Sequence, residues 1–385
     1  MPPELVAIGV RDPERARGIQ VPDSVRRTDD LKALAADAGV DVVVEVVGGR
    51  DDAQAAIETA IDSGKGVVTA NKALLGARGA ALEARARERA TALRFEAAVA
   101  GGIPVLEPIV RDLAANRIDA VRGVINGTTN HILTAMARDV RTYEDVLDEA
   151  QARGYAEADP TADISGLDAA NKLAILIRLT FGGWPDVAAL RRNVPTIAAT
   201  SPDGITGVTT LELRAAKGLD LTLKLVARAE RLADGTISAG VTLAAVPHGS
   251  PLGEVPGVTN LVEVLGEPIG RVSFRGPGAG GDATSSAVLA DVLALARGEG
   301  STWEPLPPAV APHVIDDLSG PRAWFFTEPE LAMGPMPKSI AEVTLISSDD
   351  AVVTRPMDVD DLRLRLAAAG VDELTLYPVL AMGQF

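Results

Sequence analysis

The sequence predicts an α/β protein in which a Rossmann-type doubly wound parallel sheet comes first and an α+β domain with a mixed sheet follows. Over roughly the first 100 residues, short β-branched runs alternate with Ala-rich helical stretches, which is the pattern of successive βαβ units. The run VVVEVV at 42–47 is almost continuously apolar, as expected for a parallel strand buried on both faces. After Gly102 the strands become longer, and Asp234-Gly235 indicates a hairpin between two of them. A second domain of another kind therefore begins just after Gly102.

The expected elements follow in chain order. In the first domain, 1–103, strands are expected at 4–10, 42–47, 66–69 and 93–97, with helices at 30–38, 51–63 and 73–90. In the second domain, 104–297, helices are expected at 104–116, 128–138, 142–153, 167–181 and 282–297, and strands at 118–125, 219–232, 236–245, 261–265 and 270–275. Residues 298–310 are rich in Pro and Gly and are expected to be a linker. The small C-terminal α/β region, 311–385, is expected to hold a strand at 341–346, a helix at 358–369 and a strand at 373–379.

The composition excludes several classes of protein. The chain has 385 residues, of which 47% are hydrophobic, enough for buried cores in two or three domains. A net charge of −16 argues against binding to nucleic acid or to an anionic membrane. The absence of cysteine rules out disulfides, thiolate metal sites and cysteine nucleophiles. No apolar run approaches the roughly 18 residues of a membrane span and no signal peptide is recognisable, so we expect a soluble cytoplasmic protein.

Ligands of a parallel sheet bind at the carboxyl ends of its strands, and two such ends carry candidate cofactor groups. Arg11 ends the first expected strand and is followed by Arg15 and Arg17. An Arg at this position accommodates the 2′-phosphate of NADP, although three arginines in an Arg-rich chain are more typical of a solvated face. Gly48-Gly49 follows the strand at 42–47 and allows close approach of a ligand to the backbone, or forms a plain tight turn.

Lysine is rare, with seven among 37 basic residues, so each lysine beside a strand end merits attention. Lys72 follows the strand at 66–69, where it could meet a phosphate or polarise a carbonyl, or simply be a surface lysine. The loop at 95–104 joins a strand to a helix through small residues. Its backbone carbonyls and one carboxylate are hard oxygen ligands of the kind that cations prefer.

The segment 123–130, GVINGTTN, ends a strand and opens a helix with N-cap residues, among them Asn126 and Thr128. Side-chain polar groups and helix N–H groups would converge there and suit a carboxylate or a phosphate; an ordinary capped helix is an equal alternative.

The acidic segment 154–172 is the most informative. Glu157, Asp159, Asp163 and Asp168 precede Lys172, and Asp168 and Lys172 share one helix face at i, i+4. Carboxylates beside a rare lysine could bind an ammonium group while the lysine handles a proton; an acidic helix start with an ordinary ion pair is the alternative.

A Gly-rich turn at 275–281, RGPGAGG, precedes a helix and could contact a cofactor through Gly278 and Gly280, but it lacks the G-x-G-x-x-G fingerprint of a first strand and helix. The three histidines are scattered and indicate neither a metal site nor a triad.

Six segments in the same order resemble homoserine dehydrogenase over residues 4–310. They are VVEVVGG (43–49), VVTANKALL (67–75), FEAAVAGGIPVLEPI (95–109), GVINGTTNHIL (123–133), GYAEADPTADISGLDAANKLAIL (154–176) and FRGPGAGGDATSSAVLADV (274–292). The resemblance implies interconversion of L-aspartate 4-semialdehyde and L-homoserine with NADP or NAD, a step towards threonine and methionine, in a homodimer. The absence of cysteine excludes the neighbouring enzyme aspartate-semialdehyde dehydrogenase, which needs a nucleophilic cysteine.

The resemblance also implies roles for single residues. Lys172 corresponds to the proton donor to the aldehyde oxygen, and Lys72 to a second active-site lysine near cofactor and substrate. Glu157 and Asp168 correspond to the substrate-binding carboxylates, with Asp163 in the same segment. The family's monovalent cation site, for Na⁺ or K⁺, corresponds to Glu96, Val99, Gly101 and Ile103.

Two features depart from the family pattern. The strand and G-x-G-x-x-G turn that precede the segment matching ELVAIGVRD are absent, so the expected Rossmann-type sheet is incomplete and we expect weak NADPH binding by the chain as given. A start placed too far downstream, a truncated fragment and a degenerate cofactor site are the alternatives, and the intact remaining motifs favour the first. In addition, residues 311–385 match only part of the ACT domain of many bacterial members, so threonine feedback is not predicted. A non-catalytic remnant, acting as a dimerisation or substrate-binding module, is the alternative function.

Overall fold

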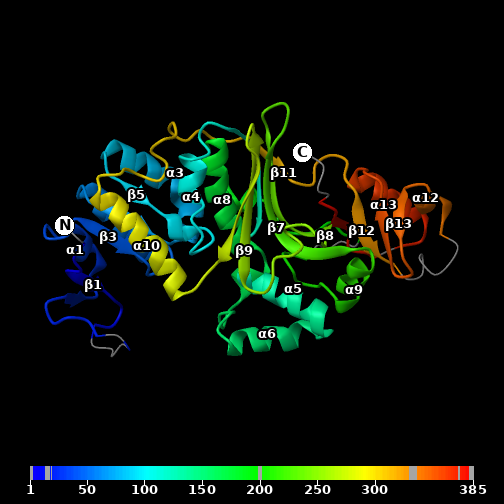
Figure 1. Cartoon of the computed structure of the whole chain (residues 1–385), viewed down its shortest axis with the longest axis horizontal. Helices are drawn as coiled ribbons and strands as arrows, with labels where there is room; N and C mark the ends of the chain where they lie inside the picture. Colours follow the sequence, from blue (N-terminus) through cyan, green and yellow to red (C-terminus); the bar gives the residue numbers. More distant parts are fainter. Residues whose placement is uncertain are drawn as a thin grey trace.

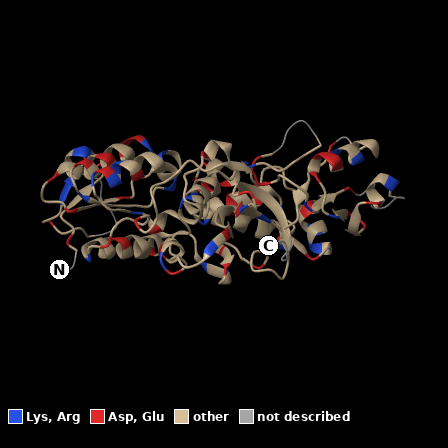
Figure 2. Cartoon of the chain, turned by 90° about the horizontal axis from the view of Figure 1, so that it is seen from above, with Lys and Arg blue, Asp and Glu red and all other residues tan. Residues whose placement is uncertain are grey.

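The computed structural model describes residues 3–13, 18, 20–197, 202–328, 336–371 and 373–380. Three regions follow one another along the long axis: the N-terminal α/β region, a central sheet with its helices, and a small C-terminal α/β region (Figure 1). Acidic and basic residues are interspersed along the chain (Figure 2). Among the described residues, none of the helices combines the length and the apolar character needed to cross a membrane.

The N-terminal region has the expected parallel pairing, in two separate sheets. β1 (Ala7–Gly9) pairs with β2 (Arg26–Thr28), and β3 (Val42–Glu45), β4 (Gly66–Thr69) and β5 (Leu93–Arg94) form a second parallel sheet. Within the described residues, no pairing joins β1 to β3. The strand β2 was not expected, because RRT carries no apolar pattern.

Helices cover this region from distant parts of the sequence. α1 (Leu31–Ala36), α2 (Asp51–Asp62) and α3 (Lys72–Glu88) follow their strands in βαβ order. α10 (Gly281–Ala296), far along the chain, packs against β3, β4 and the 3₁₀ turn η1 (Glu96–Ala98). Figure 1 shows α10 beside β3. The N-terminal region therefore depends on a helix that lies about 200 residues further along the chain than its own strands.

The central sheet is mixed, as expected, with strand order β10-β9-β6-β7-β8-β11. Its strands are β6 (Arg117–Val124), β7 (Leu221–Arg231), β8 (Ile237–Pro247), β9 (Thr259–Glu267), β10 (Gly270–Pro277) and β11 (Val314–Asp316). All neighbours are antiparallel except β8 and β11, which are parallel. The sheet brings the end of β6, the start of β9 and the end of β10 to the same edge.

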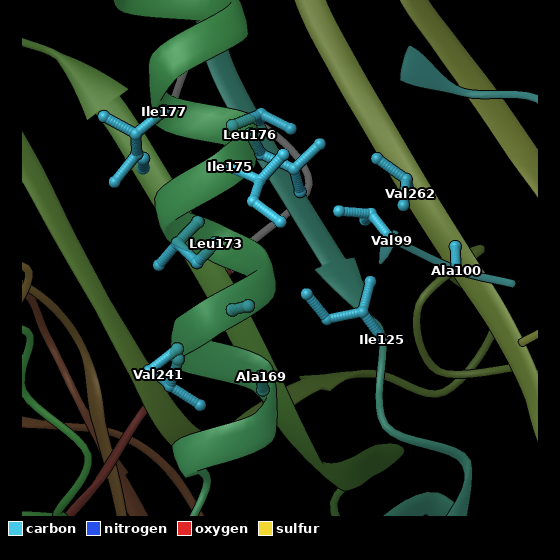
Figure 3. Close-up of a cluster of buried hydrophobic side chains, with 14 of the residues drawn as sticks. Val99, Ala100, Ile125, Ala169, Leu173, Ile175, Leu176, Ile177, Val241 and Val262 are labelled. Carbon is cyan, nitrogen blue, oxygen red and sulfur yellow. The ribbon is translucent and has the colours of Figure 1, made fainter. Parts of the chain in front are cut away.

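One helix dominates the core. α8 (Leu167–Phe181) lies across one face of the central sheet, ends at Gly182 in the left-handed conformation, and packs against α3 of the N-terminal region. In Figure 3, Ile175 and Leu176 of α8 lie on the side of the helix that faces Val99, Ile125 and Val262. This core joins residues on both sides of position 103, so α8 and α3 are held in a fixed relation.

The remaining helices of the central region pack on α8, on the central sheet or on one another. They are α4 (Leu106–Val110), α5 (Gly127–Asp139), α6 (Tyr143–Ala152), α7 (Thr161–Ile164), η2 (Val187–Ala189) and α9 (Thr210–Gly218). The helix expected at 104–116 is shorter, and the strand expected at 93–97 stops at Arg94. There the chain turns into η1 and directs the Glu96 carboxylate at the start of α4.

The C-terminal region is more complete than the sequence predicts. β12 (Trp324–Thr327), α12 (Lys338–Ala341), β13 (Thr344–Ser347), β14 (Ala351–Thr354), α13 (Val359–Ala368) and β15 (Tyr377–Pro378) form a βαββαβ unit with strand order β13-β14-β12-β15. That is the ferredoxin-like arrangement, of which only one strand, one helix and a further strand were expected. The expected linker is partly buried, since Trp303 is 1% exposed and Thr302 pairs with Leu93 of β5.

Candidate active site

Asp168 and Lys172 form the centre of the candidate site. They lie one turn apart on α8, with Lys172 Nζ 2.7 Å from Asp168 Oδ2 and 2.8 Å from the carbonyl oxygen of Ile125, at the end of β6. Both side chains are buried. The expectation that they share a helix face is confirmed, and the lysine is held by two acceptors in a fixed orientation.

A second lysine reaches the same carboxylate from the N-terminal region. Asn71 caps α3, and Lys72 is the first residue of that helix, with its Nζ 3.4 Å from Asp168 Oδ1. The Lys72 side chain is 44% exposed, whereas that of Asp168 is 7% exposed. Burial alone would raise the pKa of Asp168, but Lys172, Lys72 and the amide of Asn126 hold it below its ordinary value. The carboxylate is therefore ionised and bridges the two regions.

The start of α5 supplies the next groups. The Asn126 amide donates to Asp168 Oδ2 at 2.9 Å and to Asp163 Oδ1 at 2.7 Å, while its oxygen caps α5 by accepting from the N–H of Thr129. The Thr128 hydroxyl lies 3.0 Å from Asp163 Oδ2 and donates to the carbonyl oxygen of Tyr155. Asn126, Thr128, Asp163 and Asp168 thus form one hydrogen-bonded cluster.

Glu157 is placed apart from this cluster. Its side chain is exposed, and in the part of the chain that the structure describes its carboxylate has no hydrogen bond or ion pair. Only its carbonyl oxygen has a partner, the amide of Gln151. Asp159 likewise bonds only locally, to Thr161. The structure gives no contact that supports a substrate role for Glu157, and the role stays a prediction.

A polar network at the carboxyl ends of β3 and β4 was missed from the sequence. Glu45, 3% exposed, accepts from the N–H groups of Val47 and Gly48 and from the hydroxyl of Thr69. Thr69 bonds in turn to the N–H of Asn71, whose amide donates to the carbonyl oxygen of Gly49. The lone acidic residue in an apolar run was the available signal.

This network fixes the loop that contains Gly48 and Gly49. Both glycines have φ of +73°, which L side chains rarely adopt, and space is open around both. Their backbone is therefore accessible to a ligand at the edge of the sheet. Arg11 is exposed just after β1, while Arg15 and Arg17 lie outside the described residues.

The two glycines of the later turn differ from each other. A side chain at Gly278 would overlap the amide of Asn260, which would have to move to admit it. Gly280 has φ of +118°, precedes α10 and has open space around it. A Cβ at Gly101 would lie 2.6 Å from the carbonyl oxygen of Gly278, so this turn lies directly against the 95–104 loop.

The 95–104 loop presents buried oxygen atoms. Glu96 is 5% exposed, and its carboxylate accepts from the N–H groups of Val105, Leu106 and Glu107 at the start of α4. Burial nevertheless raises its pKa to about 7. In the described part of the chain, the carbonyl oxygens of Val99, Gly101 and Ile103 accept no hydrogen bond, although all three residues are buried. Free buried carbonyls of this kind suit a hard cation.

Comparison with known proteins gives the same family for the N-terminal and the central region of the chain. The family model described as "Homoserine dehydrogenase, NAD binding domain" matches residues 1–96, and the one described as "Homoserine dehydrogenase" matches residues 104–293. A homoserine dehydrogenase of Mycobacterium leprae is 43% identical over 297 residues, which is 76% of this chain and 64% of that protein. The chain spans 64–66% of the length of the first curated relatives that it matches.

Solved structures agree. A homoserine dehydrogenase from Thiobacillus denitrificans has a TM-score of 0.85 at 28% identity, with 98% of this chain and 90% of that chain covered. A hyperthermophilic archaeal homoserine dehydrogenase in complex with NADPH has a TM-score of 0.57 at 26% identity, with 70% and 75% covered. The first of these similarities includes the C-terminal region.

Proposed function

The chain belongs to the homoserine dehydrogenase family, and we propose that it catalyses the NAD(P)H-dependent reduction of L-aspartate 4-semialdehyde to L-homoserine, a step towards threonine and methionine. The observation that carries this proposal is the pair of lysines on one buried carboxylate, Lys172 and Lys72 on Asp168. Reduction of an aldehyde needs a hydride for the carbon and a proton for the oxygen.

Lys172 supplies the proton in this proposal. Its Nζ carries three N–H groups, of which two are engaged by Asp168 and Ile125, so one remains for the aldehyde oxygen. Asp168 orients the ammonium group of Lys172, and Lys72 lies on the exposed side of the same carboxylate. Asn126, Thr128 and Asp163 form the polar wall that receives the charged amino-acid end of the substrate, and Glu157 is proposed to approach its ammonium group.

NADP, or NAD, would supply the hydride when bound. The residues fit such a group, because Gly48 and Gly49 offer open backbone at the carboxyl edge of the parallel sheet and Arg11 is exposed where a 2′-phosphate would be neutralised. Lys72, Gly278 and Gly280 would complete the contacts. Val99, Gly101 and Ile103 would hold Na⁺ or K⁺ through their carbonyl oxygens, with Glu96 in the same loop. The enzyme would act as a cytoplasmic homodimer.

The test is direct. Purified protein with L-aspartate 4-semialdehyde and NADPH is expected to oxidise NADPH and to form L-homoserine, detected by mass spectrometry. A protein that shows neither would contradict the proposal.

One observation favours a second candidate, a non-catalytic dimerisation or substrate-binding module. The parallel strands form two unconnected sheets, β1–β2 and β3–β4–β5, among the described residues. Titration with NADPH separates the candidates, because only the first requires the chain to bind the cofactor.

A further inference from the structure

Asn260, in β9, is buried without a partner for its amide. It is 1% exposed, and neither its Nδ2 nor its Oδ1 forms a hydrogen bond with any described group. Val262, two residues on, belongs to the core cluster that contains α8, so the Asn260 side chain points to the same face of the sheet. A buried carboxamide without a bond is costly, so its presence calls for a state in which the bonds are made.

The position of Asn260 ties it to both walls of the proposed active site. In the ladder of β6 and β9, Leu261 pairs with Val124, so Asn260 is next to Ile125, whose carbonyl oxygen accepts from Lys172. On its other side Asn260 pairs with Gly276 of β10, and its amide lies against Gly278. The amide is therefore placed between the strand that orients Lys172 and the turn at 276–280.

Asn130, a second buried asparagine near the start of β9, forms hydrogen bonds with both atoms of its amide. Asn130 of α5 is also buried, and its amide donates to the carbonyl oxygens of Val255 and Gly257 while its oxygen accepts from Lys224 Nζ at 2.6 Å. These bonds fix the segment that leads into β9. The surroundings thus satisfy one buried amide fully and leave the adjacent one unsatisfied.

We propose that Asn260 is a positioning residue that hydrogen-bonds to the backbone of the 276–280 turn when the nicotinamide cofactor is bound. The amide is in packing contact with Gly278 and has no hydrogen bond to a described group. Binding of the cofactor against the turn brings the turn's N–H and C=O groups into register with the amide. Asn260 then holds this wall of the site against the strand that carries Ile125. The inference rests on the proposed function, since it requires that the chain binds NADPH or NADH.

The proposal predicts that removing the Asn260 amide weakens cofactor binding without lowering the stability of the protein that has no cofactor bound. Asn260→Leu keeps the side-chain size and removes two unbonded polar atoms, so the melting temperature of the free protein should be unchanged or higher. Its dissociation constant for NADPH, measured by quenching of protein fluorescence, should rise about tenfold, because the bonds gained on binding are absent. Asn130→Leu is the matched control: it should lower the melting temperature of the free protein, because its bonds already exist there.

The outcomes are distinguishable. An Asn260→Leu protein with an unchanged dissociation constant, or one whose free form melts as low as Asn130→Leu, overturns the inference and leaves the proposed function standing. If the unsubstituted chain binds neither NADPH nor NADH, the proposed function fails and this inference fails with it. If Asn260→Leu does not fold, the same two measurements are made on Asn260→Ala, which truncates the side chain at Cβ and introduces no new atoms.

Discussion

Lys172 Nζ lies 2.7 Å from Oδ2 of Asp168, one turn earlier on the same helix. An i, i+4 pair of this kind on a helix surface adds little, but this pair is buried and its carboxylate also faces Lys72. The two lysines that contact Asp168 come from α8 and α3, which pack on each other. The Lys172 ammonium group is therefore in position before a substrate arrives.

Lys172→Met should lower kcat by roughly 10²–10⁴-fold, which is the range that a positioned general acid contributes. Cofactor affinity should be unchanged, because in the proposed site Lys172 faces the aldehyde oxygen. NADPH oxidation and NADPH titration measure the two quantities. Lys217→Met, an exposed lysine on α9, is the control that should retain full turnover. Turnover retained by the Lys172 variant would remove that lysine from the proposed role.

Asp168→Asn should destabilise the protein in a pH-dependent manner. The folded-state pKa of Asp168 is below its ordinary value of 3.8, so its stabilisation is present above that pH and is lost as the pH falls through the folded pKa. Breaking a buried pair costs about 3 kcal/mol at pH 7. Urea unfolding at pH 7 and at pH 3 should show a difference between variant and parent that shrinks at pH 3. Asp148→Asn, at an exposed position on α6, should show no such difference at either pH.

Arg11→Ser should raise KM for NADPH about tenfold, while KM for NADH stays the same. Arg11 is exposed at the end of β1, where an adenine-ribose 2′-phosphate would need a cation and a 2′-hydroxyl would not. The ratio of kcat/KM for the two cofactors measures this, with Arg214→Ser on α9 as the control for a general change in charge. An equal change in kcat/KM for NADPH and NADH would show that Arg11 does not contact the 2′-phosphate.

Sequence patterns within single helices and strands predicted much of the fold and the Asp168–Lys172 pair of the candidate active site. The apolar run at 42–47 and the i, i+4 spacing of Asp168 and Lys172 are properties of one element each, and both are seen. β2 was missed because it is a polar triplet. α9 was also missed, although the capping box of Thr209 and Glu212 marks its start in the sequence.

Contacts between distant segments could not be predicted. The bonds of Thr69 to Glu45 and of Asn71 to Gly49 join residues more than 20 positions apart, and the unpaired amide of Asn260 depends on three strands and a turn. The separation of Glu157 from the cluster has the same origin, since a shared acidic segment does not imply a shared surface. The spacing of residues in the sequence predicts which side chains share one face of a helix. Which helices and strands contact each other depends on the tertiary packing.

Lys224→Met should have an effect on stability that grows with pH. Lys224 is 3% exposed, and burial lowers its pKa from 10.5 to about 8. Between these values the unfolded chain binds more protons than the folded one, so raising the pH stabilises the parent protein. Relative to the variant, the parent should gain about 2 kcal/mol in unfolding free energy between pH 7 and pH 10. Parallel pH profiles for the two proteins would contradict the assigned shift.

Gly278→Ala should lower the unfolding free energy by about 1–3 kcal/mol, because its Cβ would overlap the amide of Asn260 and force the turn away from β9. Adding Asn260→Ala should recover most of that loss, since the shorter side chain makes room for the new methyl group. A double-mutant cycle from urea unfolding measures this coupling. Gly249→Ala, where nothing lies within 4 Å of the added atom, should be close to neutral. Strictly additive effects of the Gly278 and Asn260 substitutions would mean that the two residues are not in contact, and the proposed route from Asn260 to the turn would then have no physical basis.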